Sequence, residues 1–211
     1  MKLKLEPAAV FGDHMVLRRN APVLLFGKAE DGVKVAARID NSQAETTAQN
    51  GRFEIALPPM PAGGPYTLQI TDGETKITFE DVMVGEVYLA GGQSNMELEL
   101  KNSDNGPALV ALADNPMIRY YHTLKTPWLD EPSLAEERKT RWRALAPGRC
   151  GDMSAVAYHF AARLQAELGV AVGVIDCCWG GTSIACWLDE AALRATIEGT
   201  ALLTAFNASI A

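Results

Sequence analysis

Short apolar or alternating segments separated by turn signals fill the first 81 residues. Asn50-Gly51 and Asp72-Gly73 favour two-residue hairpin loops, because both residues of each pair tolerate a positive φ. Short strands at this spacing predict a β-sandwich over residues 1–81, which we expect to be a supporting or sugar-contacting module. The predicted strands are Met15–Leu17, Val23–Gly27, Val33–Ile39, Arg52–Leu57, Tyr66–Ile70 and Lys76–Phe79.

From about residue 82 the pattern changes to strands and helices in alternation. Val82–Ala90, Met117–Tyr121 and Val170–Cys177 are apolar runs, which are typical of strands buried in a parallel sheet. Pro107–Ala113 is a predicted short helix between the first two of them. The sequence therefore predicts an α/β fold for residues 82–211. Three strands make a thin sheet, which suggests that this domain is incomplete at its C-terminal side.

Ser154–Leu168 is the clearest predicted helix. Ser154 is a suitable N-cap, and Gly169 is a suitable terminator. Val156, Phe160, Leu164 and Leu168 form an apolar stripe that we expect to face the core. Further along the chain, we expect a helix at Asp189–Ile197, followed by an Ala-rich apolar tail at Gly199–Ala211, and a loop at Ala144–Gly151.

Composition limits the partners. The 211 residues are 48% hydrophobic and carry a formal net charge of −7. Lysine and arginine are dispersed, so neither nucleic acid nor an anionic membrane is an expected partner, and a neutral or polyol-like substrate is. No apolar run approaches the roughly 18–20 residues that span a bilayer, and Met1–Pro7 lacks the apolar core of a secretory leader.

Cysteine usage favours a reducing compartment. Cys150, Cys177, Cys178 and Cys186 show no zinc-ligand spacing, and buried free thiols are favoured over disulfides. This predicts a cytoplasmic location, with a periplasmic or secreted protein that has lost its leader as the alternative. The absence of metal-ligand spacing and of a phosphate-binding glycine loop predicts chemistry without a cofactor.

Gly91-Gly92-Gln93-Ser94-Asn95-Met96 carries the main chemical signal. It follows an apolar strand and precedes Glu97–Lys101, which is compatible with a helix. Glycines allow a sharp turn, and a helix N-terminus supplies N–H donors, so the stretch can present Ser94 as a nucleophile. The spacing differs from G-x-S-x-G because residue 96 is Met. The alternative is a structural turn in which Ser94 is only an N-cap.

The blocks around this serine resemble a known family. Val84–Met96 is similar to the nucleophile block of the sialate O-acetylesterases, a branch of the SGNH hydrolases and carbohydrate esterases. The resemblance recurs, in the family's order, in blocks spread along the chain. These blocks are Phe11–Leu17, Ser154–Tyr158, Val172–Ile175 and Trp179–Thr182.

The resemblance implies a fold and an activity. The fold is an N-terminal β-sandwich (1–81) followed by a partial three-layer α/β/α SGNH-type domain with a parallel sheet (82–211). The activity is that of a serine esterase, which removes O-acetyl groups from sugars through an acetyl-serine intermediate. Ser94 would be the nucleophile and the acetylated carbohydrate the substrate. The rival hypothesis is a non-catalytic fragment, or a carbohydrate-binding or structural subunit that needs a further chain segment.

The oxyanion hole and the sugar contact have candidates in this chain. Backbone N–H groups of Ser94 and Gly181 are the predicted oxyanion donors, and Gly180 is able to exchange roles with Gly181. A tight turn before Thr182 is the plain structural alternative for the two glycines. Trp179 is the candidate for stacking on a sugar ring, whereas Trp187 is as easily a core residue.

The base is missing from the pattern. The family completes its site with a Gln-Gly-Glu block and a late Asp-x-x-His pair, and neither occurs here, so we expect a missing C-terminal segment to supply them. His122 follows a predicted strand and is the only histidine on the functional edge, although a loop histidine is more often solvated. His14 and His159 are expected to be structural. We expect the three carboxylates near strand and helix ends to be caps or surface groups, because no histidine is predicted beside them. These are Asp152, Asp176 and Asp189.

Overall fold

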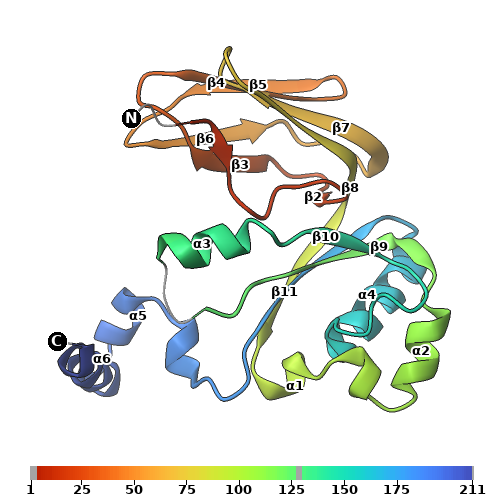
Figure 1. Cartoon of the computed structure of the whole chain (residues 1–211), viewed down its shortest axis with the longest axis vertical. Helices are drawn as coiled ribbons and strands as arrows, with labels where there is room; N and C mark the ends of the chain where they lie inside the picture. The colour runs from red at the N-terminus through yellow and green to blue at the C-terminus, as the bar shows by residue number, and fades with distance from the viewer. Residues whose placement is uncertain (1–3, 127–129, 211) are drawn as a thin grey trace.

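The computed structural model describes residues 4–126 and 130–210 and has a mixed α/β architecture (Figure 1). Two predicted segments, Met1–Pro7 and Gly199–Ala211, extend past this range: residues 1–3 and 211 lie outside the described residues. The strands are β1 Glu6–Pro7, β2 Val16–Arg18, β3 Val23–Lys28, β4 Lys34–Ile39, β5 Ser42–Thr47, β6 Arg52–Leu57, β7 Gly63–Thr71, β8 Lys76–Gly92, β9 Asn115–His122, β10 Trp142–Leu145 and β11 Val172–Cys178. The helices are α1 Ser94–Glu97, α2 Gly106–Leu112, α3 Glu131–Glu137, α4 Ala155–Leu168, α5 Glu190–Arg194, α6 Ile197–Ile210 and the 3₁₀ helices η1 Leu100–Asn102 and η2 Ile184–Trp187.

Strand β8 joins the two parts of the molecule. It runs for 17 residues, so the predicted strands Lys76–Phe79 and Val82–Ala90 are one continuous strand. Its first half pairs with β7 in the N-terminal part, and its second half pairs with β11 in the C-terminal part. Within the described residues, the sheet order is β10-β9-β11-β8-β7-β4-β5. The predicted boundary at residues 81 and 82 therefore falls inside one strand.

The N-terminal part holds a closed apolar core. β1, β3 and β6 form a second sheet, and its inward residues, such as Leu25 and Ile55, join one cluster with inward residues of β4 and β7. The Asn50-Gly51 turn is confirmed, because both residues have positive φ and Gln49 bridges Arg52. The Asp72-Gly73 loop is longer than predicted. Thr71 pairs with Lys76, and the Asp72 carboxylate accepts hydrogen bonds from two amides inside a four-residue loop.

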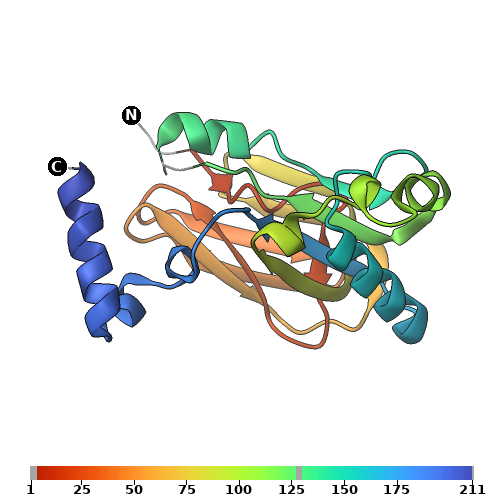
Figure 2. The ribbon, with the colours of Figure 1, turned by 90° about the horizontal axis from the view of Figure 1, so that it is seen from below.

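In the C-terminal part, β9, β11 and β8 lie parallel and side by side, as predicted. Successive β9 residues face opposite sides of this sheet. Tyr120 joins the apolar cluster beneath α4, while Tyr121 faces the other side and donates a hydrogen bond to Glu137 of α3. Helices on both sides therefore flank the sheet (Figures 1 and 2).

The caps of α4 are confirmed, but its predicted apolar stripe is wrong. Ser154 Oγ accepts a hydrogen bond from Ala157 N, and Gly169 ends the helix with left-handed backbone. The buried residues are alanines at 155, 157 and 161. Of the predicted stripe, Val156, Phe160 and Leu168 are exposed, and only Leu164 packs, partly buried, against the core. Small side chains let a helix approach a sheet closely, and this packing turned the larger apolar residues outward.

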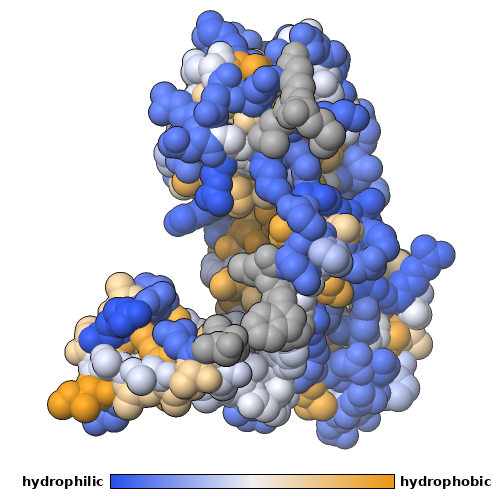
Figure 3. Space-filling model, turned by 60° about the vertical axis from the view of Figure 1, so that its left-hand side comes forward, coloured by the Kyte–Doolittle hydropathy of each residue, from blue (hydrophilic) through white to orange (hydrophobic). Residues whose placement is uncertain are grey.

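Several elements carry no clear hydrophobic pattern and were missed. β5 consists almost entirely of polar residues, and its register follows from the turn at Asp40 rather than from apolar alternation. Helix α3 lies where no element was predicted, and strand β10 extends into the predicted loop at Ala144–Gly151. The predicted tail is mostly helix α6, which projects from the body (Figures 1 and 2) and exposes Ile197, Leu202 and Phe206. The projecting arm shows orange apolar surface in Figure 3.

A buried arginine ties the two parts together. Arg119 of β9 is 4% exposed, and its guanidinium donates to the backbone oxygens of His14 and Asp81 and to the Asp81 carboxylate. His14 also contacts Asp81, at 2.7 Å, which gives this exposed histidine the structural role predicted for it. Among the described residues, no helix has the length and apolar character needed to cross a membrane.

Candidate active site

The parallel register brings three strand ends to one edge of the sheet. Cys178 of β11 lies beside Gly92 of β8, and Asp176 lies beside His122 of β9. Loops that follow such strand ends converge at this edge, which is where ligands bind in open α/β sheets. Ser94, two residues after β8, therefore shares an edge with His122 and Asp176.

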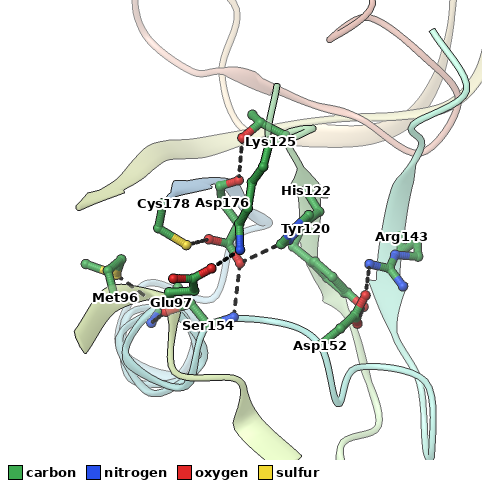
Figure 4. Close-up of polar contacts among 12 residues, drawn as sticks. Met96, Glu97, Tyr120, His122, Lys125, Arg143, Asp152, Ser154, Asp176 and Cys178 are labelled. Carbon is green, nitrogen blue, oxygen red and sulfur yellow. Dashed lines mark hydrogen bonds and ion pairs between the residues drawn. The ribbon is translucent and has the colours of Figure 1, made fainter. Parts of the chain in front are cut away.

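These loops enclose a cleft of about 490 Å³. Figure 4 shows its polar side chains converging from the strand ends and from the loop before α4. The lining residues are Ser94, Glu97, Leu98, Glu99, Asn102, His122, Lys125, Asp152, Asp176 and Cys178. The sequence predicted Ser94 here and placed His122 on this edge, but it missed the acidic and basic neighbours.

Ser94 begins a very short helix. Gln93 is the N-cap, and its side-chain oxygen accepts hydrogen bonds from both Ser94 N, at 3.0 Å, and Ser94 Oγ, at 2.7 Å. Gly92 has a φ of 153°, a backbone conformation that favours glycine at the turn out of β8. Helix α1 spans only four residues, so its dipole gives Ser94 less support than the predicted longer helix would.

Asp176 is a buried partner of His122, which corrects the expectation that it is a cap or surface group. Asp176 is 1% exposed and lies near the end of the apolar strand β11. His122 Nδ1 lies 3.5 Å from Asp176 Oδ2 and has no hydrogen bond of good geometry. One sequence signal could have revealed the pair. Asp176 is the only carboxylate in its apolar strand, and this strand and the one that ends in His122 were both predicted to end at the same edge of the sheet.

The remaining contacts of Asp176 keep it ionised. Ser154 N donates to Oδ2 at 3.0 Å, and Cys178 Sγ donates to Oδ1 at 3.1 Å. Burial opposes ionisation, but the contacts with His122, Cys178 and Ser154 hold the pKa of Asp176 below its ordinary value. In return, the carboxylate raises the pKa of His122 despite the partial burial of the ring.

Cys178 is not an alternative nucleophile. Burial and the neighbouring Asp176 carboxylate raise the pKa of its thiol to about 12, so it stays protonated at neutral pH. All four cysteines are free, as predicted, but only Cys150 and Cys178 are buried, because Cys177 is half-buried and Cys186 is exposed. In the part of the chain that the structure describes, no cluster of three or more histidine, cysteine or acidic residues is able to hold a metal ion.

The other two carboxylates differ from each other. Asp189 caps α5 by accepting from Ala192 N, as expected. Asp152 lines the cleft, where it accepts hydrogen bonds from Tyr120 at 3.0 Å and Arg143 at 2.6 Å. Burial opposes its ionisation, but these two partners hold the pKa of Asp152 below its ordinary value. Arg143 also lies over the Tyr120 ring, so Asp152 is held firmly at the wall of the cleft.

The two predicted oxyanion glycines are in different situations. Gly180 N donates a hydrogen bond to Glu97, so this amide already has an acceptor. Gly181 has a φ of 80°, a backbone conformation that favours glycine, and a Cβ at this position would meet no neighbour. Ser94 N, the other predicted donor, is engaged by Gln93. Of the three amides, those of Gly180 and Ser94 already donate to side chains, so the Gly181 amide is the best candidate for an oxyanion donor.

The two tryptophans flank the serine loop. Trp179 N donates to Gly92 O, which fixes the backbone of the glycine loop beside β8, and its ring is partly exposed. Trp187 lines a neighbouring pocket of about 440 Å³ together with Gly91–Gln93, Thr182 and Ile184. Its Nε1 donates to Thr182 Oγ1 at 3.0 Å. Trp187 thus lies in a surface pocket, whereas the sequence had favoured Trp179 as the sugar-contacting residue.

Comparison with solved structures finds one similar to this chain. The chain superimposes on a carbohydrate acetylesterase from Xanthomonas citri with a TM-score of 0.80 and 33% sequence identity, covering 90% of this chain and 44% of that one. No family model matches the chain.

Curated relatives carry a more specific name. The chain is 27% identical to the sialate O-acetylesterase of Rattus norvegicus over 206 residues, and equally similar to that of Homo sapiens. Each match covers 89% of this chain but only 38% and 39% of the relatives, respectively. The sequence resemblance to the sialate O-acetylesterases is thereby confirmed over most of this chain, and the chain spans less than half the length of these relatives.

Proposed function

We propose that this chain carries the nucleophile of a serine carboxylesterase that removes O-acetyl groups from a carbohydrate. The observation that carries the proposal is the position of Ser94, in a polar cleft at the carboxyl ends of three parallel strands. The esterase relatives support the reaction class, and the acetylated sugar follows from their names.

The proposed reaction has two steps. Ser94 Oγ attacks the acetyl carbonyl and loses its proton to a base, and the sugar oxygen takes up a proton as it leaves. Water then hydrolyses the acetyl-serine. Gly181 N–H stabilises the oxyanion in both steps. Ser94 Oγ must first leave its hydrogen bond to Gln93 Oε1, because that amide oxygen is no base.

The base has two candidate sources. His122 lies in the same cleft and is supported by Asp176. The resemblance instead implies an Asp-x-x-His pair from a later segment, and this chain spans 38–39% of its curated relatives. Among the described residues no histidine hydrogen-bonds to Ser94 Oγ, which favours the later segment and keeps a non-catalytic piece as the second candidate function.

Replacement of the nucleophile tests the proposal. In a protein that contains this chain and releases acetate from acetylated sugars, Ser94→Ala should lower kcat by several orders of magnitude. Ser209→Ala, on helix α6 away from the cleft, is the control and should retain full activity. Substantial acetate release by Ser94→Ala would rule out Ser94 as the nucleophile.

The source of the base is tested on residues 1–211 alone. If the base lies in a later segment, this chain should turn over aryl acetates very slowly, at most about 10³–10⁴ over water. Labelling of Ser94 by a fluorophosphonate should then be equally slow. Rapid turnover that disappears in His122→Ala would instead place the base within this chain.

A further inference from the structure

Glu97 links three loops at the functional edge. It ends helix α1, three residues after Ser94. Its Oε1 accepts from Lys125 Nζ, in the loop after β9 (Figure 4). Its Oε2 accepts from Gly180 N, in the loop after β11. One carboxylate thus connects the segments that follow β8, β9 and β11.

The same contacts bring the second glycine loop against the nucleophile. A Cβ built on Gly180 would overlap Glu97 Oε2 and lie 3.5 Å from Ser94 Oγ. Any side chain at residue 180 would therefore displace either the Glu97 carboxylate or the loop itself. The closeness of Gly180 to both Ser94 and Glu97 makes the position of this loop depend on Glu97.

The electrostatics favour an ionised Glu97. Its side chain is 31% exposed and that of Lys125 is 32% exposed, so solvent screens the pair only in part. Lys125 and the Gly180 amide lower the pKa of Glu97, although desolvation and the nearby Asp176 carboxylate oppose them. An ionised carboxylate is a stronger acceptor for an amide than a neutral group is.

We propose that Glu97 is a positioning residue that fixes the Gly180-Gly181 loop relative to Ser94. Glu97 occupies the amide of Gly180, which leaves Gly181 as the donor that this loop offers to the oxyanion. Lys125 holds the carboxylate in place through its other oxygen. The catalytic consequence rests on the proposed esterase function, whereas the structural link does not.

Amide hydrogen exchange tests the structural link without any need for activity. In the ¹⁵N-labelled 211-residue chain, Glu97→Ala should speed exchange at Gly180 by about tenfold or more, because the amide loses a charged acceptor. Glu97→Gln keeps an acceptor oxygen and should retain most of the protection. Glu45→Ala removes a carboxylate that pairs with Lys34 at 2.8 Å, far from the cleft, and should leave Gly180 unchanged.

Kinetics test the catalytic consequence in a protein that shows Ser94-dependent acetate release. Glu97→Ala should lower kcat by about 10²–10³ with little change in KM, as expected when a transition-state donor is misplaced. Glu97→Gln should recover most of that loss, and Glu45→Ala should match the unmodified protein.

The outcomes are separable. Unchanged exchange at Gly180 in Glu97→Ala, with the remaining amide spectrum native, would overturn the link. Faster exchange with an unchanged kcat would overturn the positioning role. Full activity of Ser94→Ala would overturn the proposed function instead, and the exchange result would still decide whether Glu97 holds the loop.

Discussion

The two parts of the molecule treat their apolar residues differently. In the N-terminal sheets, inward positions are closed off on both sides: Leu25 of β3 has no exposed surface. In the C-terminal part, Leu89 of β8 is 67% exposed and Phe160 of α4 is 45% exposed. Both parts have a buried cluster, but the described residues leave apolar side chains on the parallel sheet and on α4 uncovered.

Buried polar groups show the opposite distribution. Among the described residues, the buried polar side chains are Arg119, Ser154 and Asp176, and all three come after residue 81. Burying such groups costs free energy unless they are hydrogen-bonded or paired. Buried titratable groups are therefore concentrated at functional sites and at structural ion pairs. Asp176 and Ser154 lie at the candidate site, and Arg119 at the junction between the parts. The first part therefore buries apolar side chains, whereas the second also buries polar ones, two of them at the candidate site.

The largest expected effect contrasts two leucines, both on strands. Leu25→Ala should lower the free energy of unfolding by about 2–5 kcal/mol, because it removes buried methyl groups and leaves a cavity. Leu89→Ala should change it by no more than about 0.5 kcal/mol, as expected for an exposed position. Urea unfolding followed by circular dichroism measures both. Equal losses would mean that Leu89 is covered in solution and that the contrast between the parts is false.

A smaller effect is expected at the junction. Arg119→Met should lower the free energy of unfolding by about 2 kcal/mol, because the carbonyls of His14 and Asp81 lose their donor and the Asp81 carboxylate keeps only its contact with His14. This loss of stability is smaller than that expected for breaking a fully buried ion pair, because the Asp81 side chain is 37% exposed to water. Arg163→Met is the control: this arginine is 81% exposed and pairs with Glu167, so about 0.5 kcal/mol or less is expected. A loss at Arg119 no greater than this would show that the buried arginine contributes no more to stability than a surface pair does.

The smallest effect is a pH dependence at the site. Asp176 raises the pKa of His122 in the folded chain, so the pair stabilises the fold below the unfolded histidine pKa of about 6.5. That gain is lost as pH rises through the folded pKa of His122. It is also lost in acid, once Asp176 becomes protonated. The stability difference between the unmodified chain and His122→Gln should therefore be greatest near pH 5–6. A difference that grows above pH 7 would contradict the pairing.

Local signals identified much of this architecture. Ser154 and Gly169 are unambiguous start and stop signals for α4, and both function as predicted. The apolar runs of the parallel strands were found because such strands are buried on both faces. The polar strand β5 and the face of α4 were not predictable in this way. β5 gains its register from pairing with β4, and which stripe of α4 is buried depended on how closely it packs against the sheet.

The candidate site likewise has a part that local sequence predicts and a part that depends on packing. The sequence by itself determined that Ser94 follows a strand at the candidate site, because a strand, two glycines and a serine form a continuous local signal. It also placed His122 at the edge of the sheet where the structure has the cleft. Only the tertiary structure decided that Asp176 lies against His122 and that Glu97 joins Lys125 and Gly180. Lys125 is 28 residues from Glu97 in sequence, and Gly180 is 83 residues from it. Contacts at that range follow from strand order and register, which the spacing of residues along the chain does not encode.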